Sequence, residues 1–231
     1  MDTLLKAKHW QIFLFAFGIP WLLMFIVLGF TMVDFVSMLK ANPDPQDVAI
    51  IMTDFMSQIM IGIMPLALLS VAVTYSWMYA INKRIAPMAP IAYQPKERLV
   101  SMAIISIVIF TILNFVVSAY MYTSGLAEIF NFENNPAEIP SMGPKFLILQ
   151  VLSIMFSFVN FGLSIYVCYQ LSRALKGAEL QRHLRSDDII GPILAFVFLF
   201  IGIWFMQPIV NELHAKGPGG GNSLDNSLLL H

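Results

Sequence analysis

Five long stretches of the chain are almost entirely apolar, and short polar segments separate them. Each stretch is close to the roughly 20 residues that an α-helix needs to cross the hydrocarbon core of a bilayer. None contains a lysine or an arginine, and Asp34, near one end of the first stretch, is the one carboxylate inside them. The apolar runs cover residues 11–38, 58–81, 99–122, 146–171 and 189–211.

The pattern predicts an all-α integral membrane bundle of five transmembrane helices. Inside a helix every backbone amide finds its partner within the same segment, which the hydrocarbon interior requires. The bundle is expected to form one domain over residues 1–216. The glycine-rich residues 217–231 are predicted to be a flexible, dispensable tail, because ordering them costs about 1–2 kcal/mol per residue in backbone entropy.

Composition supports a membrane protein. Hydrophobic residues make up 58 % of the chain and charged residues 12 %, with a mean hydropathy of +0.75. A soluble domain has about 25 % charged residues, so this chain has too few polar groups to cover its apolar surface in water. The lipid bilayer is therefore its first expected partner. The one cysteine, Cys168, excludes an intramolecular disulfide and a cysteine-based zinc site.

Basic residues are concentrated in alternate connections between the runs. Because cytoplasmic loops carry the excess of lysine and arginine, this pattern places the N-terminus in the cytoplasm. Five crossings then place the C-terminus outside. Only Lys40, Lys145 and Lys216 fall on the outer side of this arrangement. The ten basic residues on the inner side are Lys6, Lys8, Lys83, Arg84, Lys96, Arg98, Arg173, Lys176, Arg182 and Arg185.

Two connections have patterns of their own. Residues 45–59 carry apolar side chains at helical spacing, and Asp44 is the predicted N-cap. They fit either an amphipathic helix on the outer surface or an extension of the second span, and the sequence favours neither. The turn-rich residues 123–145 fit either a binding surface or a solvated linker.

The last apolar run closes on Trp204, Gln207 and Pro208. Tryptophan favours the headgroup region because part of its ring system is apolar and part can donate a hydrogen bond. We therefore expect Trp204 to anchor this end at the interface and Gln207 to reach water. Pro208 lacks an amide donor and is expected to weaken continuation of the helix.

The residue patterns of common active sites are missing from the sequence. His9, His183, His214 and His231 form no pair at helical spacing, and there is no nucleotide-binding or hydrolase motif. Asp34, about one turn from an outer end, is expected to face interfacial water. We predict no catalytic, cofactor-binding or metal-binding residue. Nucleic acid is not an expected partner either, because anionic lipid headgroups account for the basic side chains.

Polar side chains recur along one face of the third and fourth runs, at helical spacing. Such stripes let helices pack closely and hydrogen-bond, typically with about 0.6 kcal/mol per bond. The alternative is a polar lining for a substrate path. In the packing interpretation Asn114 and Asn160 lie near the bilayer centre and pair with one another. This candidate interhelical contact consists of Asn114, Asn160, Thr111, Ser118, Ser157 and Ser164, with Ser153 on the same stripe.

The two ends of the chain carry a resemblance to a known family. The segments "LKAKHWQIFLFAFGIP" (5–20) and "KGAELQRHLRSDDIIGPILAFVFLFIGIWFMQP" (176–208) resemble multi-pass inner-membrane proteins of Bacteroidetes that share a KAKHWQ start and a GIWFIQP-like close. The resemblance implies a bacterial inner membrane, so that outside is the periplasm. It brings no established activity. The family follows its QP with basic residues, whereas residues 209–212 here are Ile, Val, Asn and Glu, and a basic end would favour the cytoplasm.

Three classes of function remain open from the sequence. The favoured one is a non-catalytic accessory or scaffold component of a membrane complex, which recognises a protein partner through its outer loops or helix faces. The alternative is a small oligomeric transporter or channel. A membrane enzyme is third, because no clustered set of histidine and carboxylate residues is present.

Overall fold

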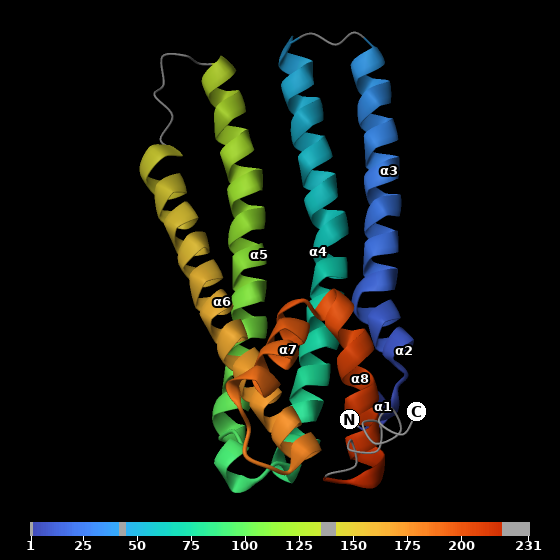
Figure 1. Cartoon of the computed structure of the whole chain (residues 1–231). Helices are drawn as coiled ribbons and strands as arrows, with labels where there is room; N and C mark the ends of the chain where they lie inside the picture. Colours follow the sequence, from blue (N-terminus) through green and yellow to red (C-terminus); the bar gives the residue numbers. More distant parts are fainter. Residues whose placement is uncertain (1, 42–44, 135–141, 219–231) are drawn as a thin grey trace. The chain divides into compact units, whose positions relative to one another are not determined.

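The computed structural model describes residues 2–41, 45–134 and 142–218, and its regular elements there are all helices (Figure 1). The predicted all-helical fold class is confirmed. Residues 219–231, most of the predicted tail, lie outside the described residues. The chain divides into two compact units. Unit one comprises Met1–Gly18, Ser70–Val108 and Phe161–His231, and unit two comprises Ile19–Leu69 and Ile109–Asn160.

Eight α-helices are assigned in these ranges, with three short irregular helical segments between them. A π-helical turn, Leu14–Gly18, joins the second helix to the third. The connection between the fourth and fifth helices contains two 3₁₀ turns, Ala86–Met88 and Ile91–Tyr93. The α-helices are α1 (Asp2–Lys6), α2 (His9–Phe13), α3 (Ile19–Lys40), α4 (Pro45–Arg84), α5 (Glu97–Asn134), α6 (Met142–Leu180), α7 (Ser186–Val197) and α8 (Leu199–Lys216).

Four helical segments in the described ranges are long and apolar enough to cross a membrane: His9–Lys40, Ile50–Met88, Ile91–Met121 and Phe146–Leu180. They coincide with the first four apolar runs. Their surfaces are apolar where a soluble protein would be polar: Phe30 and Phe158 are each 72 % exposed. The helices therefore fit a membrane-spanning protein, as the sequence predicted.

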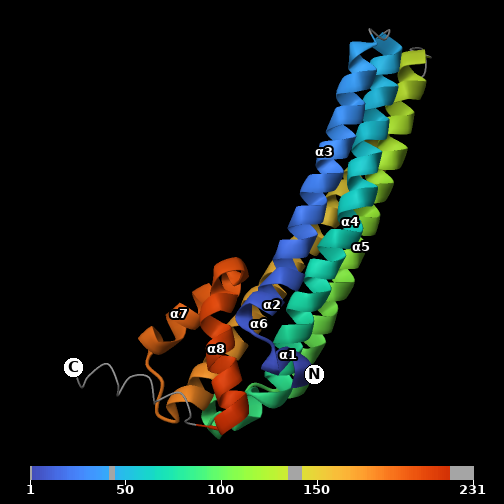
Figure 2. The ribbon, with the colours of Figure 1, turned by 90° about the vertical axis from the view of Figure 1, so that its right-hand side faces the viewer.

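The fifth apolar run is not one helix, so the prediction of a continuous helix over 189–211 is wrong. Helix α7 ends at Val197, and Phe198 leaves the helical conformation with φ −97° and ψ 54° before α8 begins. The Phe198 carbonyl then accepts the amides of Ile201 and Gly202, which starts the next helix. Figure 2 shows α7 and α8 folded back on each other as a hairpin.

A close backbone approach at Gly202 fixes this hairpin. A Cβ atom at Gly202 would lie 1.7 Å from the Ala195 carbonyl oxygen on α7. Only glycine therefore allows the two arms to come this close. Hydropathy did not reveal the fold-back, because every residue from 193 to 206 except the glycine is apolar.

Helix α8 also continues past the predicted end of the run. Pro208 lies inside it, and the helix ends at Lys216, where Gly217 adopts φ +81° and donates its amide to the Leu213 carbonyl. A glycine with positive φ just after the last helical residue is a common helix ending. The expectation that Pro208 weakens the helix end is therefore not met.

Residues 45–59 form the first part of α4 without a break, so the extension interpretation describes their secondary structure. Asp44, the predicted N-cap, lies outside the described residues. Within unit two, α3 packs on α4 and α5 on α6. Phe35 and Phe55 have ring centroids 4.4 Å apart, and Phe110 and Phe156 are 5.6 Å apart.

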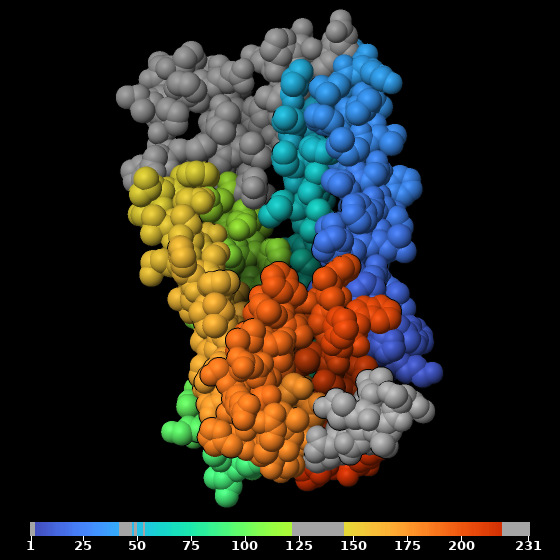
Figure 3. Space-filling model, viewed as in Figure 1, coloured from blue at the N-terminus to red at the C-terminus, as the bar shows by residue number. Residues whose placement is uncertain are grey.

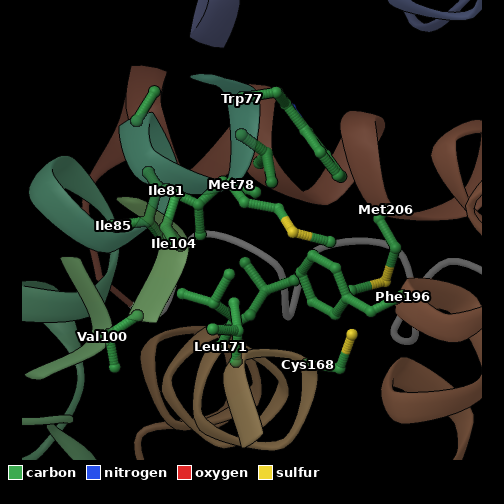
Figure 4. Close-up of a cluster of buried hydrophobic side chains, with 14 of the residues drawn as sticks. Trp77, Met78, Ile81, Ile85, Val100, Ile104, Cys168, Leu171, Phe196 and Met206 are labelled. Atoms are coloured by element: carbon green, nitrogen blue, oxygen red, sulfur yellow. The ribbon is translucent and has the colours of Figure 1, made fainter. Parts of the chain in front are cut away.

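Unit one is built around a buried apolar cluster (Figure 4). Trp77, completely buried, lies with its ring centroid 5.8 Å from that of Phe196. The cluster draws side chains from both arms of the hairpin, which is how α7 and α8 are attached to the longer helices. Its labelled members are Trp77, Met78, Ile81 and Ile85 from α4, Val100 and Ile104 from α5, Cys168 and Leu171 from α6, Phe196 from α7 and Met206 from α8.

We predict that Gly202→Ala lowers the free energy of unfolding by about 1–3 kcal/mol, because the added methyl group collides with the α7 backbone. Thermal or denaturant unfolding in mild detergent measures the loss. Gly191→Ala is the matched control, since a Cβ atom there meets no atom within 4 Å. The control gains the helix propensity of alanine without a collision. Equal stability of the two variants would contradict the close approach.

Candidate functional site

The side-chain amide of Gln207 is the centre of a buried polar cluster in unit one. Gln207 is 0 % exposed, although the sequence predicted that it reaches water. Its Nε2 donates to the carbonyl oxygens of Leu4 at 3.2 Å and Ala7 at 2.9 Å, with a longer contact of 3.4 Å to that of Leu5. The expectation of a solvated glutamine is wrong, because the N-terminal segment covers it.

Two further side chains complete the cluster. The indole Nε1–H of Trp77 donates to Gln207 Oε1 at 2.6 Å. Gln207 Nε2 also contacts Asn211 Oδ1 at 2.8 Å, and Asn211 Nδ2 donates to the Ala7 carbonyl at 3.2 Å. A buried amide without partners is costly, and here both ends of the Gln207 amide are used. We refer to Gln207, Trp77, Asn211 and the carbonyls of Leu4, Leu5 and Ala7 as the Gln207 cluster.

The carbonyls in this cluster belong to a break in the chain. Helix α1 ends at Lys6, so the carbonyls of its last turn, including those of Leu4 and Leu5, have no amide partner further along α1, and Ala7 lies in the break before α2 starts at His9. Gln207 supplies those partners from α8. The two ends of the described chain therefore meet at this point, which no spacing in the sequence indicates.

Aromatic rings extend the contact between α2 and α8. The His9 and Trp204 ring centroids are 4.6 Å apart, and Phe13 lies 5.5 Å from Trp204. Trp204 is 43 % exposed. Its outer part is therefore free to meet lipid or water, while its inner part packs on the N-terminal helix.

A second cluster joins the connection between α4 and α5 to the end of α6. The Arg173 guanidinium lies between two aromatic rings, 5.6 Å from the centroid of Tyr93 and 5.4 Å from that of Tyr169. Tyr93 Oη accepts the backbone amide of Leu184 at 2.9 Å. At Gly177 an added Cβ would lie 3.1 Å from Tyr93 Cβ, so a small residue is needed there. These contacts order a connection that was predicted only as a basic loop.

The start of α7 carries a side-chain cap. Asp188 accepts the backbone amide of Arg185 at 2.8 Å, and Arg182 donates to its other oxygen at 3.0 Å. These contacts, the Arg185 amide first, lower the pKa of the Asp188 carboxyl below its ordinary value. The carboxylate is therefore charged where the helix N-terminus favours negative charge.

The predicted polar stripes face each other across α5 and α6 in unit two, but with a different pairing. Asn114 donates to Ser157 Oγ at 3.0 Å and accepts from Ser153 Oγ at 2.6 Å. Asn160 donates to Thr111 Oγ1 at 2.8 Å. Each amide thus bonds hydroxyl groups of the opposite helix in place of the other amide. The expected direct pair of Asn114 and Asn160 is not formed.

The shift is about one helical turn. Asn114 on α5 lies opposite Ser157 on α6. Because the two helices are antiparallel, Thr111, three residues before Asn114, lies opposite Asn160, three residues after Ser157. The register places Asn114 opposite Ser157, whereas the sequence counted inward from helix ends that it located too coarsely. Asn160 Oδ1 is buried without a hydrogen-bond partner in the described part of the chain.

The two remaining members of the predicted contact lie elsewhere. Ser164 belongs to unit one, where its hydroxyl lies 3.1 Å from Tyr75 Oη. Ser118 is half-buried on α5, one turn beyond Asn114. The structure therefore joins Asn114, Ser153, Ser157, Asn160 and Thr111 by hydrogen bonds between α5 and α6, whereas Ser164 bonds Tyr75.

The sequence reasoning missed the Gln207 cluster. A glutamine enclosed by apolar residues in "GIWFMQPIV" was its available signal, but nothing local to that segment names Trp77 or the N-terminal carbonyls. Within the described residues no group of three or more histidine, cysteine, aspartate and glutamate side chains is arranged to hold a metal ion.

No family model, curated protein or solved structure matches this chain. The geometry of the helices and of these clusters is therefore the basis for assigning a role.

We predict that Gln207→Leu destabilises the protein strongly, because it removes the partner of the Trp77 indole N–H and of the Leu4 carbonyl, at about 1–3 kcal/mol for each buried group left unsatisfied. Unfolding in mild detergent measures the loss. Trp77→Phe removes the indole donor and also leaves a small cavity, because the buried ring becomes smaller. The double variant should lose less than the sum of the single losses, with a coupling of about 0.5–3 kcal/mol. Additive losses would show that the two side chains do not interact.

Proposed function

We propose that this protein is a non-catalytic multi-pass membrane protein that acts as an accessory or scaffold component of a membrane complex. The observation that carries the proposal is the use of the polar side chains between α5 and α6. Asn114, Ser153 and Ser157 form one hydrogen-bonded set, and Asn160 bonds Thr111. Side chains that are used to bind helices together are not free to coordinate a solute, which favours a structural role over a polar path.

The exposed apolar faces of the helices are the proposed means of recognition. Leu22, Phe25 and Val33 on α3 are between 58 % and 67 % exposed, and Ile61 on α4 is 70 % exposed. In a bilayer such faces contact either lipid or the helices of another membrane protein. Association there depends on close packing, so these faces suit a permanent partner subunit.

We further propose four membrane crossings, with both chain ends in the cytoplasm of a bacterial inner membrane. The sequence alone predicted an external C-terminus because it counted residues 189–211 as a fifth crossing. The fold-back at Phe198 supports a hairpin that returns to its side of origin. Lys216 then joins the ten inner basic residues, and Lys40 and Lys145 are the two left outside. Positive residues thus favour four crossings over five.

The α7–α8 hairpin favours a second candidate, a small oligomeric transporter or channel. Interrupted apolar helices are typical of transporter binding sites, where the break exposes backbone groups to a cavity. The break at Phe198 is of this kind. The hydroxyl of Ser70 and the side chain of Thr74 line a cavity of about 440 Å³ next to Phe198 in unit one. This cavity is walled mainly by apolar residues, so the scaffold proposal remains first.

For the topology, we expect that a membrane-impermeant maleimide added to intact cells does not label Lys216→Cys in a Cys168→Ala background. Asn135→Cys is the positive control, because both topologies place the third connection outside. Pro90→Cys is the negative control. All three should be labelled after the membrane is opened. Labelling of position 216 from outside would restore the five-span arrangement.

For the function, we expect that purification in mild detergent after crosslinking in cells yields a second membrane protein in a constant ratio to this chain. Mass spectrometry identifies that protein. Reconstitution into liposomes should produce no flux of ions or small solutes. A homo-oligomer with measurable flux would contradict the scaffold proposal and support the transporter or channel.

A further inference from the structure

An apolar groove runs between the two arms of the α7–α8 hairpin in unit one. Its volume is about 450 Å³. Gly191 and Leu194 line it from α7, and Ile201, Phe205 and Ile209 line it from α8. In the space-filling view, the side chains of this hairpin form the near surface of unit one (Figure 3). Almost every side chain that lines the groove is apolar.

Two glycines shape the groove. Gly202 lets the arms meet closely near the tip, whereas an added Cβ at Gly191 would meet no atom within 4 Å. The side chains that line the groove are exposed on the surface of unit one: Leu194 is 51 % exposed and Phe205 is 68 % exposed. In a bilayer, the acyl chains of lipids contact a surface of this kind.

One charged side chain lines the groove, and it is basic. Lys176 on α6 contributes its ammonium group. One of its three N–H donors faces Glu179, at 2.7 Å, which leaves two donors for another acceptor. Arg173 lies about one turn before Lys176 on α6, so this part of the helix carries a second basic residue that attracts anionic headgroups.

We propose that this groove binds an anionic phospholipid, with one acyl chain between α7 and α8 and the headgroup phosphate at Lys176. The apolar walls match an alkyl chain, and the ammonium group matches a phosphate oxygen by charge-assisted hydrogen bonding. A neutral lipid would fill the same walls without gaining this contact. The proposal requires the hairpin to lie in the membrane, and it does not require a protein partner.

The test measures phosphatidylglycerol and phosphatidylcholine retained by the full-length protein after reconstitution in nanodiscs of an equal mixture and extraction into mild detergent. Native mass spectrometry counts the bound lipids. Wild-type protein should retain phosphatidylglycerol in preference. Lys176→Gln should lower that preference about fivefold, the factor that corresponds to one basic residue near an anionic surface. Lys176→Arg should restore it.

Matched variants separate the proposed contacts from general effects. Lys96→Gln removes an exposed basic residue on the same side of the chain and should leave the preference unchanged. Glu179→Gln breaks the ion pair of Lys176 but keeps the ammonium group, so it should keep or raise phosphatidylglycerol retention. Gly191→Phe fills the groove and should release both lipids, whereas Gly162→Phe adds the same ring at another open helical glycine and should not.

Equal effects of Lys176→Gln and Lys96→Gln, or equal retention of the two lipids by wild-type protein, would overturn the assignment of an anionic headgroup. Unchanged lipid retention in a folded Gly191→Phe variant would overturn the acyl-chain site. If that variant fails to fold, the comparison of Lys176→Gln, Lys176→Arg and Glu179→Gln decides the proposal alone. A partner protein found in the complex would bear on the scaffold role and leave this result unaffected.

Discussion

The burial of backbone carbonyls at the N-terminal break of the chain is the constraint on which unit one depends. Between α1 and α2 the helix is interrupted, and the carbonyls of the half-buried residues Leu4 and Ala7 face α8. Gln207 satisfies them from the far end of the sequence, and Trp77 satisfies Gln207 in turn. An amide can do this because it donates and accepts at once. Remove it, and three elements that are distant in sequence lose their common polar contact.

Hydropathy alone was sufficient to locate the four long helices, because a membrane-spanning segment is defined by length and by the absence of charge. The fifth run satisfied the same criteria and still folded back. Its break at Phe198 accompanies a tertiary contact, the passage of Gly202 against the Ala195 carbonyl, and residues 193–206 on either side of the break contain no polar side chain. The hydropathy of a segment shows only that the segment is apolar enough to cross a membrane. Whether it folds into a hairpin depends on the contacts between the two arms.

The sequence predicted which faces of the two helices carry the polar contact, but not which side chains form hydrogen bonds with each other. The spacing of Asn114 and Thr111 on one helix, and of Ser157 and Asn160 on the other, placed them on the facing stripes. Their pairing depends on the axial register of α5 against α6, and one helical turn, about 5.4 Å, changes which side chains meet. Ser153 and Ser157 then serve Asn114 from consecutive turns, so one amide uses both its donor and its acceptor. The register is set by all the apolar contacts along the helices, which the sequence positions of polar residues do not reveal.

The meeting of the chain's two ends at Gln207 gives each end contacts that it lacks alone. The N-terminal segment supplies backbone carbonyls and the ring of His9, and α8 supplies the amide of Gln207 and the ring of Trp204. Neither half is satisfied without the other: the carbonyls would be buried and unpaired, and the glutamine would be an isolated polar group on an apolar helix. Gln207 therefore ties α8 to the N-terminal segment, while Gly202 ties α8 to α7.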